Sequence, residues 1–83
     1  MSQRDEVLAK IIERGSTLFG KKPEEMTEDL RFTEDLNAKS TNISQITTFL
    51  EDEFDIEVPY MQFRRKKTLG EAADYVAELL ENE

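Results

Sequence analysis

Three groups of side chains in this chain of 83 residues could take part in chemistry or binding. One is Ser40, a hydroxyl directly before an amphipathic segment; the others are an acidic run, Glu51–Glu57, and four successive cations, Arg64–Lys67. Histidine and cysteine are absent, so the commonest general base, the commonest metal ligand and the thiolate nucleophile are missing. A self-contained Ser–His or Cys–His enzyme is therefore excluded, and any chemistry of that kind must be supplied from outside the chain.

The acidic run has the charge of a calcium site but lacks its spacing. An EF-hand loop places oxygen ligands at fixed alternating positions and a glycine at its sixth position. Here Phe54 and Ile56 interrupt the carboxylates, and the run contains no glycine. We therefore predict a solvated acidic face and no metal site.

The four cations reverse the local charge of an otherwise acidic chain. The chain has eleven basic and nineteen acidic residues, and these four are among the basic ones. The rest of the chain therefore has seven basic residues against nineteen acidic ones. One interpretation is self-neutralisation, in which the cations pair with nearby carboxylates and with the C-terminal end of a short helix. The other is a docking patch for an acidic partner or an anionic membrane surface. The sequence supports the two about equally.

The length and composition predict one small globular domain over residues 1–83. Hydrophobic residues make up 37% and charged residues 36%, and the net charge of −8 argues against nucleic-acid binding, because phosphates would repel most of the surface. No apolar run approaches the roughly 18 residues of a membrane span. The N-terminus also lacks the apolar stretch of a signal peptide. We expect a cytoplasmic monomer.

Hydrophobic spacing predicts an all-α protein, a small bundle of three principal helices and one short helix. The clearest helix follows Ser40, a good N-cap residue, because the next apolar residues recur on one helical face. Gly20 is expected to stop the first helix and Pro59 to limit the second, while Thr68 and Glu71 form a capping box before the last. A long loop follows the first helix. The predicted helices cover residues 3–18, 40–54, 60–66 and 69–81.

Much of the chain carries a recognisable pattern of motifs. Phe32-x-x-Asp35 is followed by a leucine, a short turn, Ser40 and an amphipathic helix that ends, over residues 50–59, in an acidic run and a proline. Together with Ala72–Val76, these residues resemble the acyl carrier protein family, and the resemblance covers nearly the whole chain. It implies a four-helix bundle in which Ser40 is esterified by 4′-phosphopantetheine, a cofactor from coenzyme A whose thiol carries acyl groups as thioesters.

The resemblance also implies a carrier that is not itself catalytic and presents thioesters to partner enzymes. Those partners are a phosphopantetheinyl transferase (holo-acyl carrier protein synthase) and acyltransferase, ketosynthase or ligase enzymes. The residues expected to contact partners are Lys39, Thr41, Asn42, Gln45, Thr48, Glu51, Asp52, Arg64 and Arg65. The interior residues expected to line a space for the acyl chain are Ile43, Ile46, Leu50, Phe54, Phe63, Ala72, Ala73 and Val76.

The chain departs from the family pattern around its serine. Lys39 and Thr41 replace the usual aspartate and leucine, and Asn42 and Gln45 replace acids two and five residues after the serine. Asn37 stands where the family commonly has glycine, a mild change because asparagine also tolerates a positive φ.

The departures share one direction, a loss of acidic and aliphatic contacts at the serine end of the helix. Thr47 and Thr48 replace exposed aliphatic residues that touch partner enzymes, whereas the acids of Glu51–Glu53 are kept. Partners in ordinary fatty-acid synthesis present basic patches, so these changes would weaken docking by roughly 1–4 kcal/mol. We therefore predict a carrier for a dedicated lipid, fatty-acid-derived or secondary-metabolite pathway.

Two other interpretations stay open. One is a degenerate carrier fold that acts as an adaptor or regulatory protein without phosphopantetheine. The other is an unrelated acidic helical module that binds proteins and in which Ser40 is an ordinary helix cap.

Overall fold

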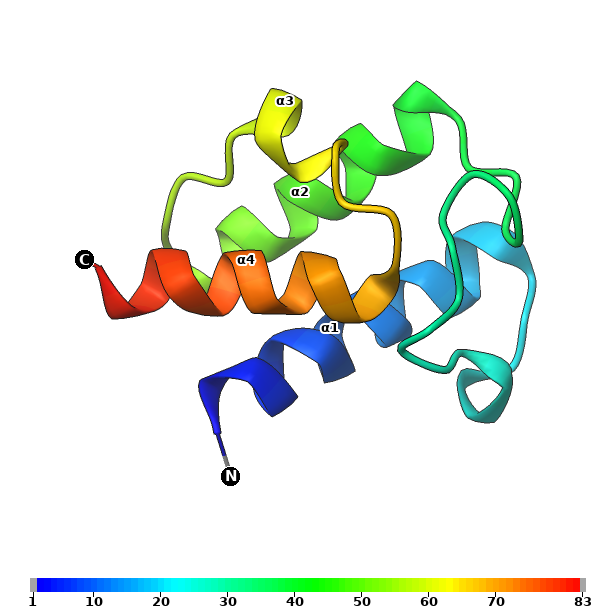
Figure 1. The fold of residues 1–83 in the computed structure, drawn as a ribbon, viewed down its shortest axis with the longest axis horizontal. Coiled ribbons are helices and arrows are strands. Elements are labelled where there is room, and N and C mark those ends of the chain that lie inside the picture. Colours follow the sequence, from blue (N-terminus) through cyan, green and yellow to red (C-terminus); the bar gives the residue numbers. More distant parts are fainter. Residues whose placement is uncertain (1, 83) are drawn as a thin grey trace.

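The computed structural model describes residues 2–82 and places four α-helices in one bundle (Figure 1). The elements are α1 (Gln3–Phe19), a 3-10 turn η1 (Pro23–Glu25), α2 (Ser40–Phe54), α3 (Tyr60–Phe63) and α4 (Leu69–Glu81). No strand is present among the described residues. The predicted all-α fold, with three principal helices, one short helix and a long loop after the first, is confirmed. None of these helices is long and apolar enough to cross a membrane.

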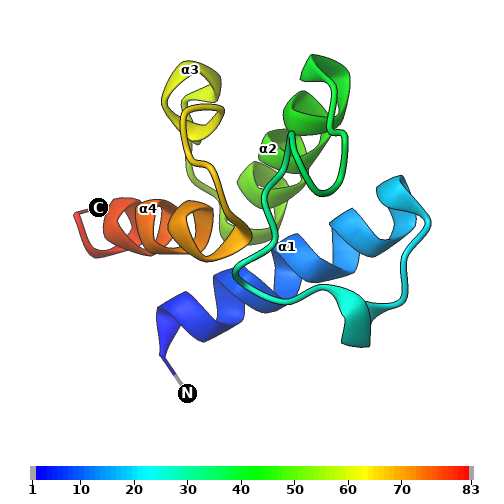
Figure 2. The same cartoon turned by 45° about the vertical axis from the view of Figure 1, so that its right-hand side comes forward.

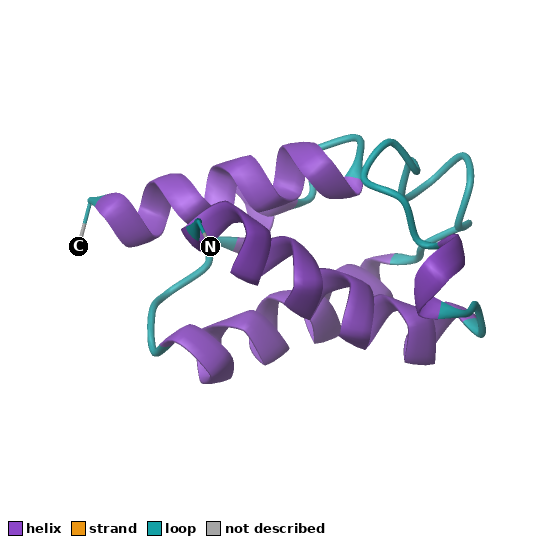
Figure 3. Cartoon of the chain, turned by 90° about the horizontal axis from the view of Figure 1, so that it is seen from below, coloured by secondary structure: helices purple, strands orange, loops and turns teal. Residues whose placement is uncertain are grey.

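The helices pack so that the start of α2 lies away from the two ends of the chain. Helix α1 contacts both α4 and α2, and α2 contacts α3. The first residues of α1 and the last of α4 lie on one side of the view in Figure 1, and α2 begins on the other. Figure 2 shows α1 along the face of the bundle opposite α3. The long loop fills the end where α1 stops and α2 starts (Figure 3).

Local capping explains where α1 and α4 begin and end. The Oγ of Ser2 accepts the Asp5 N–H at 3.1 Å, and Gly20 ends α1 in the left-handed region at φ 65° as predicted. At α4, Thr68 Oγ1 accepts the Glu71 N–H at 3.1 Å. The Glu71 carboxylate accepts the N–H of Lys67 at 3.3 Å, so the capping box closes one residue before Thr68.

The long loop is held against the bundle by buried side chains and by backbone pairing. Met26, Phe32 and Leu36 are all buried, which agrees with a loop pinned at several points. The N–H of Phe32 donates to the carbonyl of Lys67 at 2.9 Å, and the N–H of Leu69 donates to the carbonyl of Leu30 at 3.0 Å. These bonds join the loop to the segment that leads into α4.

The short helix, which we expected over residues 60–66, is shorter than predicted. Helix α3 ends at Phe63, because the N–H groups of Arg65 and Lys66 bond to carbonyls three residues back instead of four. The carbonyl of Lys67 accepts the N–H of Phe32, which belongs to the loop. The cations therefore follow α3 instead of forming its last turn.

The core is formed by one cluster of buried apolar side chains from all four helices and the loop. Seven of the eight residues predicted to line an acyl space belong to it, and Phe54 is only partly buried against it. The buried seven are Ile43, Ile46, Leu50, Phe63, Ala72, Ala73 and Val76.

Candidate functional site

Ser40 is the first residue of α2, and its side chain is exposed. The expectation that it is the N-cap is wrong by one residue: Lys39 holds that position with an extended backbone, φ −101° and ψ 166°. The reason is the Asn42 side chain, whose Oδ1 accepts the Lys39 N–H at 3.0 Å, while the Lys39 carbonyl accepts the Ile43 N–H at 3.1 Å. Lys39 is thus the N-cap of α2, and Ser40 lies exposed in the first turn of the helix.

The start of α2 differs from the starts of α1 and α4 in having no side-chain cap. Ser2 and Thr68 each accept a backbone N–H of the following helix, whereas Lys39 has only donors and makes no such bond. The first-turn N–H groups of α2 are therefore not taken by a capping side chain within residues 2–82. Such groups, together with the positive end of the helix dipole, attract anions.

A cavity of about 300 Å³ opens beside Ser40. It joins the start of α2 to α3 and to the long loop, so it brings Arg64 next to Ser40 across 24 positions of sequence. Its lining residues are Phe32, Thr33, Ala38, Lys39, Ser40, Ile43, Tyr60 and Arg64. The sequence analysis did not assign Thr33, Ala38 and Tyr60 to the site. Only Tyr60 could have been found, from its place directly after Pro59 in the motif.

A second cavity, of about 110 Å³, adjoins the first and shares Thr33 and Arg64 with it. Its lining is mostly cationic: Arg31, Thr33, Glu34, Arg64, Arg65, Lys66 and Lys67. Basic charge is therefore continuous from Lys39 to Lys67, although the two are far apart in sequence.

The run Arg64–Lys67 does not neutralise itself by ion pairing. Within residues 2–82, Arg4, Lys10 and Arg31 form ion pairs with carboxylates, and none of the four cations of the run does. Lys66 instead places its Nζ 5.0 Å from the centre of the Tyr75 ring, a cation–π contact. The part of the self-neutralisation interpretation that pairs these cations with carboxylates is thus not seen within residues 2–82, whereas Arg64 does lie at the C-terminal end of α3.

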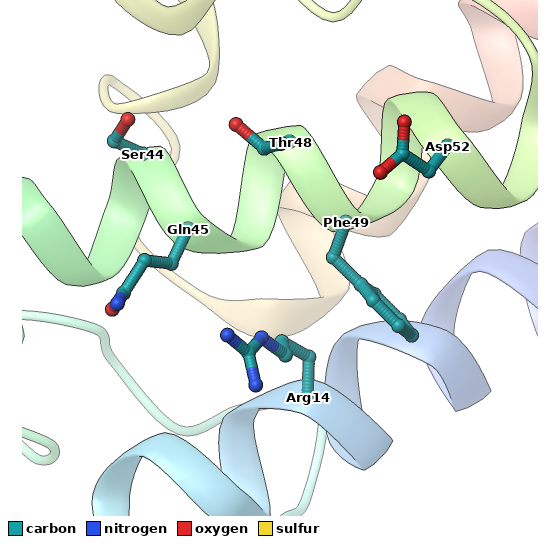
Figure 4. Close-up of a pocket in the computed structure, with 6 residues that line it drawn as sticks. All are labelled: Arg14, Ser44, Gln45, Thr48, Phe49 and Asp52. Atoms are coloured by element: carbon teal, nitrogen blue, oxygen red, sulfur yellow. The ribbon is translucent and has the colours of Figure 1, made fainter.

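Three predicted partner residues in the middle of α2 line one cavity, although their side chains point in different directions. Gln45, Thr48 and Asp52 line a cavity of about 300 Å³ with Arg14, Ser44 and Phe49. Figure 4 shows Gln45 and Phe49 pointing toward α1, where Arg14 lies, while Thr48 points away from it. Lys39, Thr41, Thr48, Asp52, Arg64 and Arg65 are exposed, and Asn42 is half-buried.

Two side chains of α2 have structural roles that the sequence analysis did not assign. Thr47 is buried and its hydroxyl donates to the Ser44 carbonyl at 2.8 Å, so the interpretation of Thr47 as an exposed replacement is wrong. Its place on the interior stripe, four residues after Ile43, explains the burial. Glu51, predicted to contact partners, accepts the N–H of Val58 at 2.9 Å and so holds the segment before α3.

Asp35 holds the turn of the long loop that brings Phe32 into the core. Its Oδ2 accepts the N–H of Arg31 at 2.8 Å and the Nε–H of the same residue at 3.2 Å. The side-chain hydrogen bond, with help from the backbone N–H, holds the pKa of Asp35 below its ordinary value. Asn37, two residues on, adopts φ 53°, the positive angle that the family glycine would also supply.

Of the residues predicted to line an acyl space, Ile43 alone lines the cavity beside Ser40. The other predicted members lie among the core side chains, apart from the partly buried Phe54.

The chain is similar to known proteins in both sequence and fold. No protein-family model matches the sequence. The chain is 35% identical over 72 residues to the acyl carrier protein of Borreliella burgdorferi (strain ZS7), covering 87% of this chain and 90% of that protein. It is 35% identical over 78 residues to the acyl carrier protein of Rickettsia bellii, covering 94% of this chain and 96% of that protein. A solved structure of an acyl carrier protein from Enterococcus faecalis superposes with a TM-score of 0.74 at 33% identity, covering 94% of this chain and 98% of that one.

Proposed function

This chain belongs to the acyl carrier protein family, and from that premise we propose that it carries acyl groups as thioesters on a 4′-phosphopantetheine arm esterified to Ser40. Members of the family are carriers, and the arm supplies the thiol that the chain itself lacks. We propose that this chain likewise presents its cargo to partner enzymes and does no catalysis.

The observation that carries the proposal is the environment of the Ser40 hydroxyl. It is exposed at the first position of α2, so a transferase can reach it. The adjoining N–H groups are free of a side-chain cap, and Lys39 and Arg64 line the neighbouring cavity. Donors and positive charge of this kind suit a phosphodiester, which is an anion without a donor of its own.

The core suggests where an acyl chain would enter. Ile43 lies between the cavity beside Ser40 and the buried cluster, because it belongs to both. An acyl chain that passes Ile43 has to separate side chains that are now packed without exposure, such as Ile46 and Phe63. We propose that this step, and not a preformed tunnel, limits the length of chain that the protein shelters.

The partners proposed are a phosphopantetheinyl transferase and one or more acyltransferases, ketosynthases or ligases of a dedicated pathway. The support lies at the start of α2, where Lys39 and Thr41 are exposed and no acid stands in the first turn. Enzymes that present basic patches to a carrier helix lose attraction there, by roughly 1–4 kcal/mol. That corresponds to docking about five- to several-hundred-fold weaker.

Intact mass spectrometry tests the attachment. The chain is co-expressed with a broad-specificity phosphopantetheinyl transferase, together with Ser40→Ala and, as a matched control, Ser44→Ala, which removes another exposed serine of α2. We expect a phosphopantetheine adduct on the parent chain and on Ser44→Ala, and none on Ser40→Ala. An unmodified parent chain, under conditions that fully load a standard carrier, favours the alternative of a carrier-fold adaptor.

Transfer kinetics test the dedicated pathway. The loaded chain and a housekeeping acyl carrier protein are compared as substrates of the same housekeeping ketosynthase, and we expect a lower kcat/KM for this chain. Equal values would refute specialisation and leave the carrier function intact.

A further inference from the structure

We propose that Lys39, Met61, Arg64 and Arg65 form a surface beside Ser40 that docks an acidic patch of a protein partner. We call these four residues the basic docking surface. The inference rests on the proposed carrier function, because a partner that binds here reaches the Ser40 arm.

The charge of this surface is available to a partner. Lys39, Arg64 and Arg65 are exposed, and none of them forms an ion pair within residues 2–82. Arg4, Lys10 and Arg31, by contrast, are paired with carboxylates. Arg14, Lys21 and Lys22 also form no ion pair within residues 2–82, so what distinguishes Arg64 and Arg65 in a chain of net charge −8 is that they line one cavity with Lys66 and Lys67.

The surface is contiguous with the site of attachment. Lys39 and Arg64 line the same cavity as Ser40, and Arg64 with Arg65 lines the adjoining one. A partner held by these residues would therefore sit directly over the Ser40 hydroxyl.

An exposed apolar side chain gives the surface the composition of a protein interface. Met61 is 53% exposed and is the one large hydrophobic residue classed as exposed among the described residues. The Nη1 of Arg64 lies 3.9 Å from the Sδ of Met61, so the two side chains form one patch on α3. Methionine and arginine are both enriched at the centres of protein–protein interfaces.

The same features disfavour a membrane as the occupant. Helix α3 has only four residues and offers Met61 alone, whereas helices that lie in a lipid surface expose a long apolar face. Glu34 lines the basic cavity together with Arg64 and Arg65, so the patch is bordered by an acid. A flat anionic membrane surface would be repelled by an acidic group at the border of the patch. A small acidic patch on a protein can bind the cations without approaching that group.

Nuclear magnetic resonance tests the surface on the full-length 15N-labelled chain. The probe is a short synthetic peptide of glutamates interrupted by leucines, added at low salt. We expect amide shifts at Lys39, Met61, Arg64 and Arg65, and weaker binding as sodium chloride is raised.

Charge variants make the test specific. Arg64→Gln with Arg65→Gln should weaken peptide binding about fivefold or more, as expected for the loss of two charge contacts. Arg64→Lys with Arg65→Lys keeps the charge and should retain most of the affinity. The matched control, Lys21→Gln with Lys22→Gln, removes the same charge from two exposed lysines outside both cavities and should have no effect.

Besides the absence of peptide binding, two outcomes would overturn the proposal. One is an equal loss of affinity in the Lys21/Lys22 control, which would indicate nonspecific attraction. The other is binding to phosphatidylserine-containing vesicles that needs Arg64 and Arg65, without binding to the peptide, which would assign the surface to a membrane. Loading of Ser40, measured separately by mass, decides the carrier function: a chain that loads but does not bind the peptide refutes only the docking surface.

Discussion

The ring of Phe32 in the long loop packs against the ring of Phe63 in α3, with centroids 6.0 Å apart and an interplanar angle of 54°. Both side chains are buried, at 3% and 0% exposure. Phe32 also lines the cavity beside Ser40. This aromatic pair therefore holds together the loop, the short helix and the site, and it supports the position of Arg64 next to Ser40.

We predict that Phe32→Ala lowers the free energy of unfolding by about 3–5 kcal/mol, because it leaves a cavity under the site. That is a large part of the roughly 4–12 kcal/mol expected for a chain of this length. Urea unfolding measures the change. Met61→Ala, which truncates an exposed residue of α3, is the control and should change stability by less than about 0.5 kcal/mol. Similar effects of the two variants would show that the aromatic pair is not important for stability.

Ser40→Ala should leave the stability of the unloaded chain within about 0.5 kcal/mol of the parent, because the hydroxyl is not a cap. Thr68→Ala is the matched comparison: its hydroxyl accepts the Glu71 N–H, and its loss should cost about 1 kcal/mol. Both are measured by chemical denaturation. If the two variants prove equally destabilised, Ser40 caps α2 after all.

Lys39→Asp should stabilise the unloaded chain by about 0.5–2 kcal/mol, because aspartate supplies the missing N-cap and a negative charge at the positive end of α2. Lys39→Gln, which removes the charge without adding a preferred cap, should gain much less. Thermal and urea unfolding distinguish the two. Equal gains would mean that removal of the lysine charge, and not capping, is responsible.

Stability should fall on acidification partly through Asp35. Hydrogen bonds from Arg31 lower the pKa of Asp35 in the folded chain. The stability that the ionised carboxylate contributes is therefore fully present above the ordinary pKa of 3.8, and it is lost as the pH falls through the lower pKa of the folded state. Asp35→Asn should therefore have a flatter dependence of unfolding free energy on pH below about 4. Asp52→Asn, at an exposed aspartate without an ion pair in residues 2–82, is the control. A parent chain and Asp35→Asn with parallel pH profiles would contradict this role.

The elements themselves were predictable, because the forces that form them act between near neighbours in sequence. The apolar stripe after Ser40 indicated α2, Gly20 marked the end of α1, and Pro59 separated α2 from α3. The motif containing Phe32 and Asp35 indicated the loop that precedes Ser40. Each of these inferences depends on residues within one or two helical turns.

Tertiary contacts decided what the local pattern left open. Helix α3 stops at Phe63, and the segment after it pairs with the loop through the carbonyl of Lys67, a contact across 35 positions that local spacing does not encode. One difference is local: the Asn42 side chain, three residues on, accepts the N–H of Lys39, and the cap of α2 is Lys39 instead of Ser40. Packing also decided which charges are paired, since ion pairs form only where folding brings opposite charges together. The sequence by itself determined the helices and pointed to the hydroxyl of Ser40; only the folded chain placed Arg64 in the lining of the same cavity, without an ion pair within residues 2–82.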